Sequence, residues 1–180
     1  MLALIGLPGA GKTTVGRRLA NALDTSFADL DRRIEEVVGC TIPQYFREMG
    51  EAGFRDVEAR VLRETIAQGV GVLSTGGGSI LREESRLLLR QHAQVVFLEV
   101  EPRVLLARLR PDGRRPLFQG VDPAGRLHEL HTARDALYRA TAHHIVAAGA
   151  GPMSSIIRRI IATLNPETPS IPVHSSESMT

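Results

Sequence analysis

The stretch GLPGAGKTT at residues 6–14 constrains the fold more than any other part of this 180-residue chain. It follows a short apolar run and opens a segment with apolar residues at fourfold spacing, which predicts a strand, a glycine-rich turn and a helix. The spacing of Gly6, Gly11, Lys12 and Thr13 fits G-x-x-x-x-G-K-[ST] in the context where this pattern forms a phosphate-binding loop. Successive backbone N–H groups and the helix N-terminus would face phosphate oxygens, so we expect a bound nucleoside triphosphate.

Lys12 should reach the β- and γ-phosphates, and the Thr13 hydroxyl should ligate Mg²⁺. Lys12 is the only lysine among 22 basic residues, which indicates a site where a compact ammonium is needed instead of a planar guanidinium. A GTPase switch is excluded because its base-reading motif N-K-x-D needs another lysine. A large ATPase motor needs a much longer chain. A small kinase is the class that fits best.

The amino-acid composition limits the kinds of partner that the protein is expected to bind. A chain of this length with 43% hydrophobic residues predicts one globular domain. The net charge of +2, the aromatic content of 4% and the lack of Trp do not favour nucleic-acid binding. The single cysteine, Cys40, excludes an internal disulfide and a cysteine-based metal site. No apolar run reaches membrane-span length and no basic leader is visible, so we expect a cytoplasmic, monomeric protein without membrane contact.

Strand-like and helix-like segments alternate along the chain, which predicts βαβ units and a parallel sheet with helices on both faces, an α/β fold. The strands are expected at 2–6, 26–31, 69–73, 93–100 and 143–147. The helices are expected at 12–23, from a Thr41 cap to Gly50, at 51–68, about 80–90, from Pro102 to near Arg110, after residue 125 to about Ala142, and at 153–164. We expect one domain at 1–164, a mobile lid at about 111–125 and a disordered tail at 165–180.

Several charged residues are candidates for a second substrate. Asp29 and Asp31 flank Leu30 at the end of a predicted strand and would point to one face, towards the loop. One carboxylate could hold a hydrated metal, and the other could accept a hydrogen bond from an attacking hydroxyl. The alternative is that Asp31 merely caps the following helix. Arg55 and Glu58 would share a helix face, and a solvated ion pair is the alternative there.

Two further stretches have unusual composition. Arg115, Pro116 and Leu117 lie in the turn-rich segment, where a rigid proline beside an arginine suits delivery of the arginine to phosphates on closure. Three glycines follow Thr75, and each costs backbone entropy, about 0.5–1 kcal/mol relative to alanine. Something must therefore approach the backbone of residues 76–78 closely. Arg134, on a later helix, is unremarkable by itself.

The ordered set GLPGAGKT, DLD, FRDVE, TGGG, RPL and RDALY closely resembles shikimate kinase along residues 1 to about 164. Apart from the phosphate-binding loop no single motif is specific, whereas their order and spacing together are. The resemblance implies a fold like that of nucleoside monophosphate kinases, a P-loop three-layer α/β/α arrangement around a five-stranded parallel sheet of order 2-3-1-4-5. It also implies transfer of the γ-phosphoryl of ATP, with Mg²⁺, to the 3-hydroxyl of shikimate, on the route to chorismate and the aromatic amino acids.

The resemblance further implies roles for individual residues, with an acceptor-binding region at about 31–61. Asp31 would hold shikimate hydroxyls and, with Lys12 and the lid Arg115, carry the catalysis, while Asp29 would hold the metal's water shell. Arg55 and Arg134 would grip the carboxylate, Glu58 would orient Arg55, and the Gly77 N–H would contact the acid. The ring would pack on Phe46, Phe54, Pro116 and Leu117, and a Cβ at Gly76, Gly77 or Gly78 would take up the acid's space. ATP would contact Gly9, Ala10, Gly11, Lys12, Thr13, Thr14, Arg115 and either Arg108 or Arg110.

Two departures from the family pattern leave questions open. Ala136 replaces a usual proline, and the loop at 147–152 lacks the arginine often found beside adenine, so stacking could fall to Arg108 or Arg110. A gluconate kinase is the alternative enzyme, and the pair Arg55 and Arg134 argues against it because two arginines suit a carboxylate. A related binding or regulatory protein without catalysis is the other alternative. It should have lost Lys12, Asp31 or an acceptor arginine, and all are present.

Overall fold

The computed structural model describes residues 1–108, 122–149 and 151–164. Its sheet has five parallel strands in the order β2-β3-β1-β4-β5, as expected. The strands are β1 (Leu2–Ile5), β2 (Phe27–Asp29), β3 (Val72–Ser74), β4 (Gln94–Glu99) and β5 (His144–Ala147). The helices are α1 (Lys12–Ala22), α2 (Leu30–Val38), α3 (Ile42–Ala67), α4 (Glu83–His92), α5 (Pro102–Arg108), α6 (Pro123–Thr141) and α7 (Met153–Leu164).

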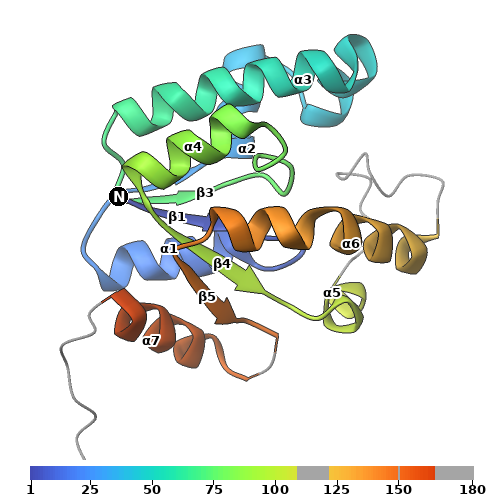
Figure 1. Cartoon of the computed structure of the whole chain (residues 1–180). Coiled ribbons are helices and arrows are strands. Elements are labelled where there is room, and N and C mark those ends of the chain that lie inside the picture. Colours follow the sequence, from blue (N-terminus) through green and yellow to red (C-terminus); the bar gives the residue numbers. More distant parts are fainter. Residues whose placement is uncertain (109–121, 150, 165–180) are drawn as a thin grey trace, which may run out of the picture.

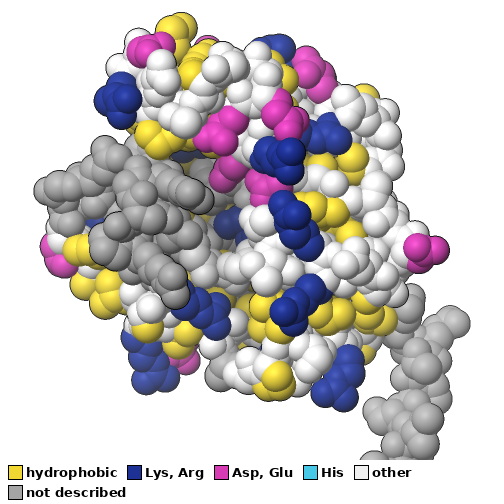
Figure 2. Space-filling model, turned by 180° about the vertical axis from the view of Figure 1, so that it is seen from behind, with side chains coloured by type: hydrophobic (Ala, Val, Ile, Leu, Met, Phe, Trp, Pro, Cys, Tyr) yellow, Lys and Arg dark blue, Asp and Glu magenta, His cyan; other side chains and the backbone are white. Residues whose placement is uncertain are grey.

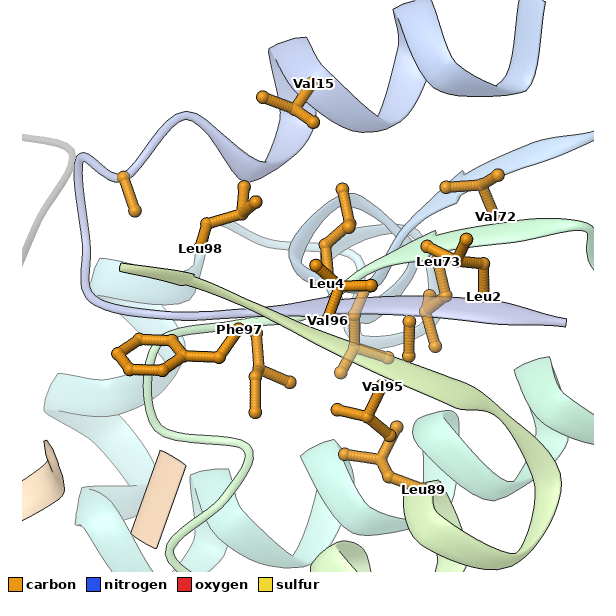
Figure 3. Close-up of a cluster of buried hydrophobic side chains, with 14 of the residues drawn as sticks. Leu2, Leu4, Val15, Val72, Leu73, Leu89, Val95, Val96, Phe97 and Leu98 are labelled. Carbon is orange, nitrogen blue, oxygen red and sulfur yellow. The ribbon is translucent and has the colours of Figure 1, made fainter. Parts of the chain in front are cut away.

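Helices cover both faces of the sheet. Helices α1 and α7 lie on one face, and α3, α4 and α6 on the other (Figure 1). The central strand β1 is wholly buried, and Val15 of α1 and Leu89 of α4 pack on the strands from opposite sides (Figure 3). Strands buried on both faces need apolar residues at nearly every position, and LALI and QVVFLE meet that requirement. The sheet therefore holds the ends of its strands on a rigid base.

The boundary between β2 and α2 differs from the expected strand at 26–31. The strand ends at Asp29, whose Oδ1 accepts the backbone N–H groups of Asp31 and Arg32 at 3.1 and 3.4 Å and so caps α2. Asp31 is thus in the first turn of a helix. The prediction of a period-two pair was wrong, and so was the alternative that Asp31 is the cap. Asp29, two residues earlier, caps the helix instead and satisfies two of its orphan N–H groups.

Helix α3 contains the stop that the sequence indicated. Thr41 is its N-cap, and its hydroxyl accepts the Gln44 N–H at 3.4 Å. At Gly50 the backbone has φ 70° and ψ −177°, which is outside the helical region and favours glycine. The two expected helices are therefore consecutive parts of one bent element. The first part carries Phe46, and the second carries Arg55.

The segment 111–125 falls mostly outside the described residues, which exclude 109–121. The sequence predicts a loop up to residue 125, but the last three residues of this segment form the start of α6. The Asp122 side chain caps this helix by accepting the N–H groups of Ala124 and Gly125 at 3.1 and 2.8 Å. The tail at 165–180 is also outside the described ranges. None of the helices within these ranges is long and apolar enough to cross a bilayer. On the face seen in Figure 2, acidic side chains gather in the upper middle of the view, and basic ones are spread below them among apolar patches.

Candidate active site

The phosphate-binding loop joins β1, the central strand, to α1. Lys12 is only 8% exposed, and its ammonium donates to the carbonyls of Gly6 at 2.8 Å and Leu7 at 3.1 Å. The lone lysine thus lies across the loop and braces its curved backbone. Ala10, within the loop, is buried, and its N–H donates to Leu7 O at 3.1 Å. It does not line the cavity described next.

A cavity of about 460 Å³ opens at the carboxyl ends of the strands, where parallel sheets bind ligands. It runs from the phosphate-binding loop to the glycine turn after β3 and to helices α2, α3 and α6. Its lining consists of Pro8, Gly9, Gly11, Lys12, Thr13, Thr14, Asp31, Glu35, Ile42, Phe46, Phe54, Arg55, Glu58, Thr75, Gly76, Gly77, Gly78, Arg108 and Arg134. Most side chains predicted for the two substrates therefore face one space.

Oxygen atoms gather at the base of the cavity near the start of α1. The Thr13 hydroxyl donates to Asp29 Oδ2 at 2.6 Å and lies 3.4 Å from the Ser74 hydroxyl at the end of β3. Hydroxyl and carboxylate oxygens are ligands that Mg²⁺ prefers, directly or through water. Within the described ranges, no group of three or more His, Cys, Asp or Glu side chains could hold a metal ion. A cation here would therefore depend on phosphate oxygens and water for most of its shell.

Asp31 points into the cavity from the first turn of α2. Desolvation of the carboxyl group by the protein around it raises the pKa of Asp31 to about 6. The carboxylates of Asp29, Glu58 and Glu35 act in the same direction, and the ammonium of Lys12 acts against them. The side chain itself is open to the cavity. A carboxylate with this pKa is mostly ionised at neutral pH and is a better proton acceptor than an ordinary aspartate.

Arg55 and Glu58 form a buried ion pair, not the solvated one considered as an alternative. Their Nη1 and Oε2 atoms are 2.5 Å apart, and the two residues are 8% and 3% exposed. Glu58 Oε1 accepts the hydroxyl of Ser79 at 2.7 Å, and Glu51 binds Arg55 Nη2 at 3.2 Å. Among the described residues, Arg55 Nε has no hydrogen-bond partner. A buried donor without a partner is costly unless a ligand satisfies it.

Arg134 reaches the same wall of the cavity from α6. Its Nη1 donates to the carbonyl of Gly77 at 3.1 Å, and the hydroxyl of Tyr138 donates to that same oxygen at 2.5 Å. Burial and the nearby guanidinium of Arg55 lower the pKa of Arg134. Two partly desolvated arginines that repel each other across a cavity favour an anion between them.

The glycine turn is close to other side chains of the protein itself. A Cβ at Gly76 would lie 2.8 Å from Asp31 Oδ1 and 2.9 Å from Glu58 Oε1, and one at Gly77 would lie 2.8 Å from the Pro8 ring. A Cβ at Gly78 would collide with the Arg55 guanidinium. Side chains here would displace the groups that face the cavity. The steric reason for three glycines therefore lies in the packing of the site, before any ligand is considered.

The comparisons with known proteins agree on one family. The family model for shikimate kinase matches residues 8–165. The chain belongs to the shikimate kinase family. A shikimate kinase from Ralstonia nicotianae is 42% identical over 89% of this chain and 84% of its own length. One from Neisseria gonorrhoeae is 49% identical over 81% of this chain and 85% of its own length.

Solved structures support the same assignment. A shikimate kinase from Acinetobacter baumannii, in complex with shikimate, is 40% identical, has a TM-score of 0.88 and is matched over 91% of both chains. A gluconokinase from Sinorhizobium meliloti shares the fold at a TM-score of 0.60 and 20% identity, over 92% of this chain and 91% of that one. The gluconate kinase alternative is therefore supported at the level of fold alone.

In this member of the shikimate kinase family, the cavity has an apolar patch beside the arginines. Phe46 and Phe54 line it with ring centroids 5.7 Å apart. Their predicted companions Pro116 and Leu117 lie outside the described residues, as do Arg110 and the lid Arg115. Arg108 lines the cavity and donates to the carbonyls of Ala148 and Gly149 at 3.4 and 2.9 Å.

Sequence reasoning missed several residues of this site. Glu35 lies one helical turn after Asp31 and accepts the N–H of Ile42 at 3.0 Å, which ties α2 to the start of α3. A helix in place of the expected strand end would have indicated this i, i+4 pair. Ser79 directly follows the glycine run and Tyr138 ends the RDALY motif, but neither motif by itself indicates which atoms these two hydroxyls contact. The remaining residues that were missed are Pro8, Ile42, Ser74 and Thr75.

Proposed function

We infer that this chain transfers the γ-phosphoryl of ATP to the 3-hydroxyl of shikimate and forms shikimate 3-phosphate on the route to aromatic amino acids. Membership of the shikimate kinase family supports this reaction. The observation that carries it is the arrangement of one cavity: the phosphate-binding loop forms one end, and two buried arginines on separate helices form the other. A triphosphate and a small carboxylate would meet between these two ends.

The loop and Lys12 would bind the phosphates. Phosphate oxygens would replace the Gly6 and Leu7 carbonyls as acceptors for the ammonium, which already lies at the loop. Arg108 is held at the far side of the nucleotide region by the chain after β5, and we propose that it packs beside adenine. The resident cation would be Mg²⁺, held by the Thr13 hydroxyl and, through water, by Asp29. It would neutralise phosphate charge.

The acceptor would be oriented by charge and by shape. Arg55 and Arg134 would hold the carboxylate, and Arg55 offers a buried Nε that lacks a partner among the described residues. Phe46 and Phe54 would cover the ring. Asp31 would then accept a hydrogen bond from the attacking hydroxyl, with a pKa of about 6 that suits a proton acceptor at neutral pH. The main contribution to phosphoryl transfer is the positioning of the two substrates.

The lid at about 111–125, Arg115 within it, and the monomeric, cytoplasmic state stay predictions. A coupled assay of ADP release tests the proposed reaction, with MgATP alone, with shikimate and with gluconate. We expect turnover of about 1–100 s⁻¹ with shikimate only. Release that is indifferent to shikimate would refute the assignment. Binding of both substrates without turnover would favour the non-catalytic alternative.

A further inference from the structure

Tyr138 is a buried side chain next to the active site to which no role has been assigned so far. It is 1% exposed, and its ring is stacked on Phe97 of β4 with centroids 5.0 Å apart and planes 17° apart. Its hydroxyl donates to the carbonyl of Gly77 at 2.5 Å. The ring is thus fixed by the core, and the hydroxyl is delivered to one atom of the glycine turn, 61 residues away in sequence.

The peptide that receives this hydrogen bond lies between the two arginines. Its carbonyl, from Gly77, also accepts Arg134 Nη1 at 3.1 Å. Its other residue, Gly78, lies so close to Arg55 that a Cβ would collide with the guanidinium. Rotation of this one peptide would therefore change the position available to both arginines.

A run of glycines needs an external anchor to keep one conformation, because glycine has the widest choice of backbone angles. Arg134 is an unreliable anchor for Gly77, since an anionic ligand would compete with the carbonyl for its guanidinium. Tyr138 gives its one hydroxyl proton to this carbonyl, and its oxygen also interacts with the guanidinium of Arg134, so the hydroxyl links the peptide to that arginine. Burial raises the pKa of Tyr138 above its usual value, so the hydroxyl keeps its proton and stays a donor.

We propose that Tyr138 is a positioning residue for the acceptor: its hydroxyl fixes the peptide between Gly77 and Gly78 and, through it, the geometry of Arg134 and Arg55. The proposal rests on the function inferred above, in which these arginines bind the shikimate carboxylate. Tyr138 acts on substrate binding and does not touch the reacting atoms. Its effect belongs in the affinity for shikimate and not in the affinity for nucleotide.

The test is Tyr138→Phe, which keeps the ring and its stack on Phe97 and removes the hydroxyl alone. We expect the shikimate KM, and the dissociation constant measured by calorimetry, to rise about tenfold, the size of one buried hydrogen bond. The KM for MgATP should stay within about twofold, and kcat should fall less than the shikimate affinity does. Shikimate should also raise the melting temperature of the variant less than that of the wild type.

Thr141→Val is the matched control. Thr141 is a fully buried hydroxyl residue on the same helix, and it donates to Leu137 O at 2.7 Å, away from the glycine turn. This variant should lose stability and keep its affinity for shikimate. Wild-type shikimate affinity in Tyr138→Phe, or equal losses for shikimate and MgATP, would overturn the proposal. A wild-type enzyme that does not bind shikimate at all would instead overturn the proposed function.

Discussion

Thr13 and Asp29 are joined by a 2.6 Å hydrogen bond between Oγ1 and Oδ2, which links the start of α1 to the end of β2 past the intervening strand β3. The other oxygen of Asp29 caps α2, so one carboxylate would serve the proposed cation site and a helix terminus together. Asparagine caps helices about as well as aspartate, whereas alanine does not. These two functions can therefore be separated by mutation.

Asp29→Asn should keep the cap and lose the charge. We expect a melting temperature close to that of the wild type and a Mg²⁺ requirement raised roughly tenfold, because a charged oxygen near the cation becomes neutral. Asp29→Ala should lose the cap as well, at about 0.5–2 kcal/mol of stability. Titration of activity with Mg²⁺ tests the loss of charge, and thermal melts test the loss of the helix cap. An unchanged Mg²⁺ dependence in Asp29→Asn would remove Asp29 from the cation site.

Asp31 should set the acid limb of the pH profile. Below its pKa of about 6 the carboxyl is protonated and cannot accept the hydroxyl proton, so kcat/KM should fall as the pH drops through that value. Asp31→Asn should lose about 10²–10⁴-fold in kcat, keep its affinity for ATP, and show no such limb. Near-normal kcat in this variant would show that no base acts at this position.

Replacing Asp31 should also make the folded protein more stable at neutral pH. The pKa of Asp31 in the folded protein, about 6, lies above its ordinary value of 3.8, so the folded state binds more protons between the two values, and stability from this group is lost as the pH rises through them. At pH 7 the wild type therefore carries an unfavourable charge that Asp31→Asn removes. We expect the variant to melt at a higher temperature than the wild type at pH 7 and to lose this advantage near pH 4.

Lys12 should not be replaceable by arginine. The ammonium fits between the carbonyls of Gly6 and Leu7 as a compact charge, and a guanidinium is wider and flat. We expect Lys12→Arg to lower kcat by roughly 10²–10³-fold, the usual cost of losing one preorganised donor to a transition state. Exposed Arg18→Lys, on the same helix, is the control and should be neutral. An active Lys12→Arg enzyme would make the lone lysine a compositional accident.

Ser79 should affect shikimate through Glu58. Its hydroxyl donates to Glu58 Oε1 at 2.7 Å while the other oxygen holds Arg55, so Ser79→Ala leaves a buried carboxylate oxygen with one donor fewer. We expect the shikimate KM to rise about 5- to 20-fold, with the MgATP KM unchanged. Equal changes in both KM values would instead indicate a general loss of structure.

The sequence predicted those parts of the site that a local pattern defines. Lys12 and Thr13 belong to a motif whose strand and helix are adjacent in the chain, and both lie where the motif predicts. Arg55 and Glu58 were placed on one helix face correctly, but spacing alone could not distinguish a solvated pair from a buried one. That difference depends on Ser79 and on the glycine turn, which pack against them from another element.

The misplaced β2–α2 boundary has a physical cause as well. The stretch FADLD supports either an alternating strand or a capped helix, and the choice rests on the hydrogen bonds of Asp29 with Asp31 and Arg32. Asp31 still reaches the cavity, because the first turn of α2 lies at the carboxyl end of β2. Its position at the cavity was thus predicted from an incorrect local geometry, and its role there stays a prediction.

The central position of β1 in the sheet determines when, during synthesis of the chain, the phosphate-binding loop can become functional. Strand β1 is held on one side by β3 and on the other by β4, which ends at Glu99, so the loop at residues 6–14 has no complete support until more than half of the chain has been synthesised. A nascent chain that stops before β4 should therefore have the whole motif and yet bind no nucleotide. The amino-terminal motif becomes a working site only through strands translated much later, so ATP can stabilise the finished fold but cannot guide its first steps.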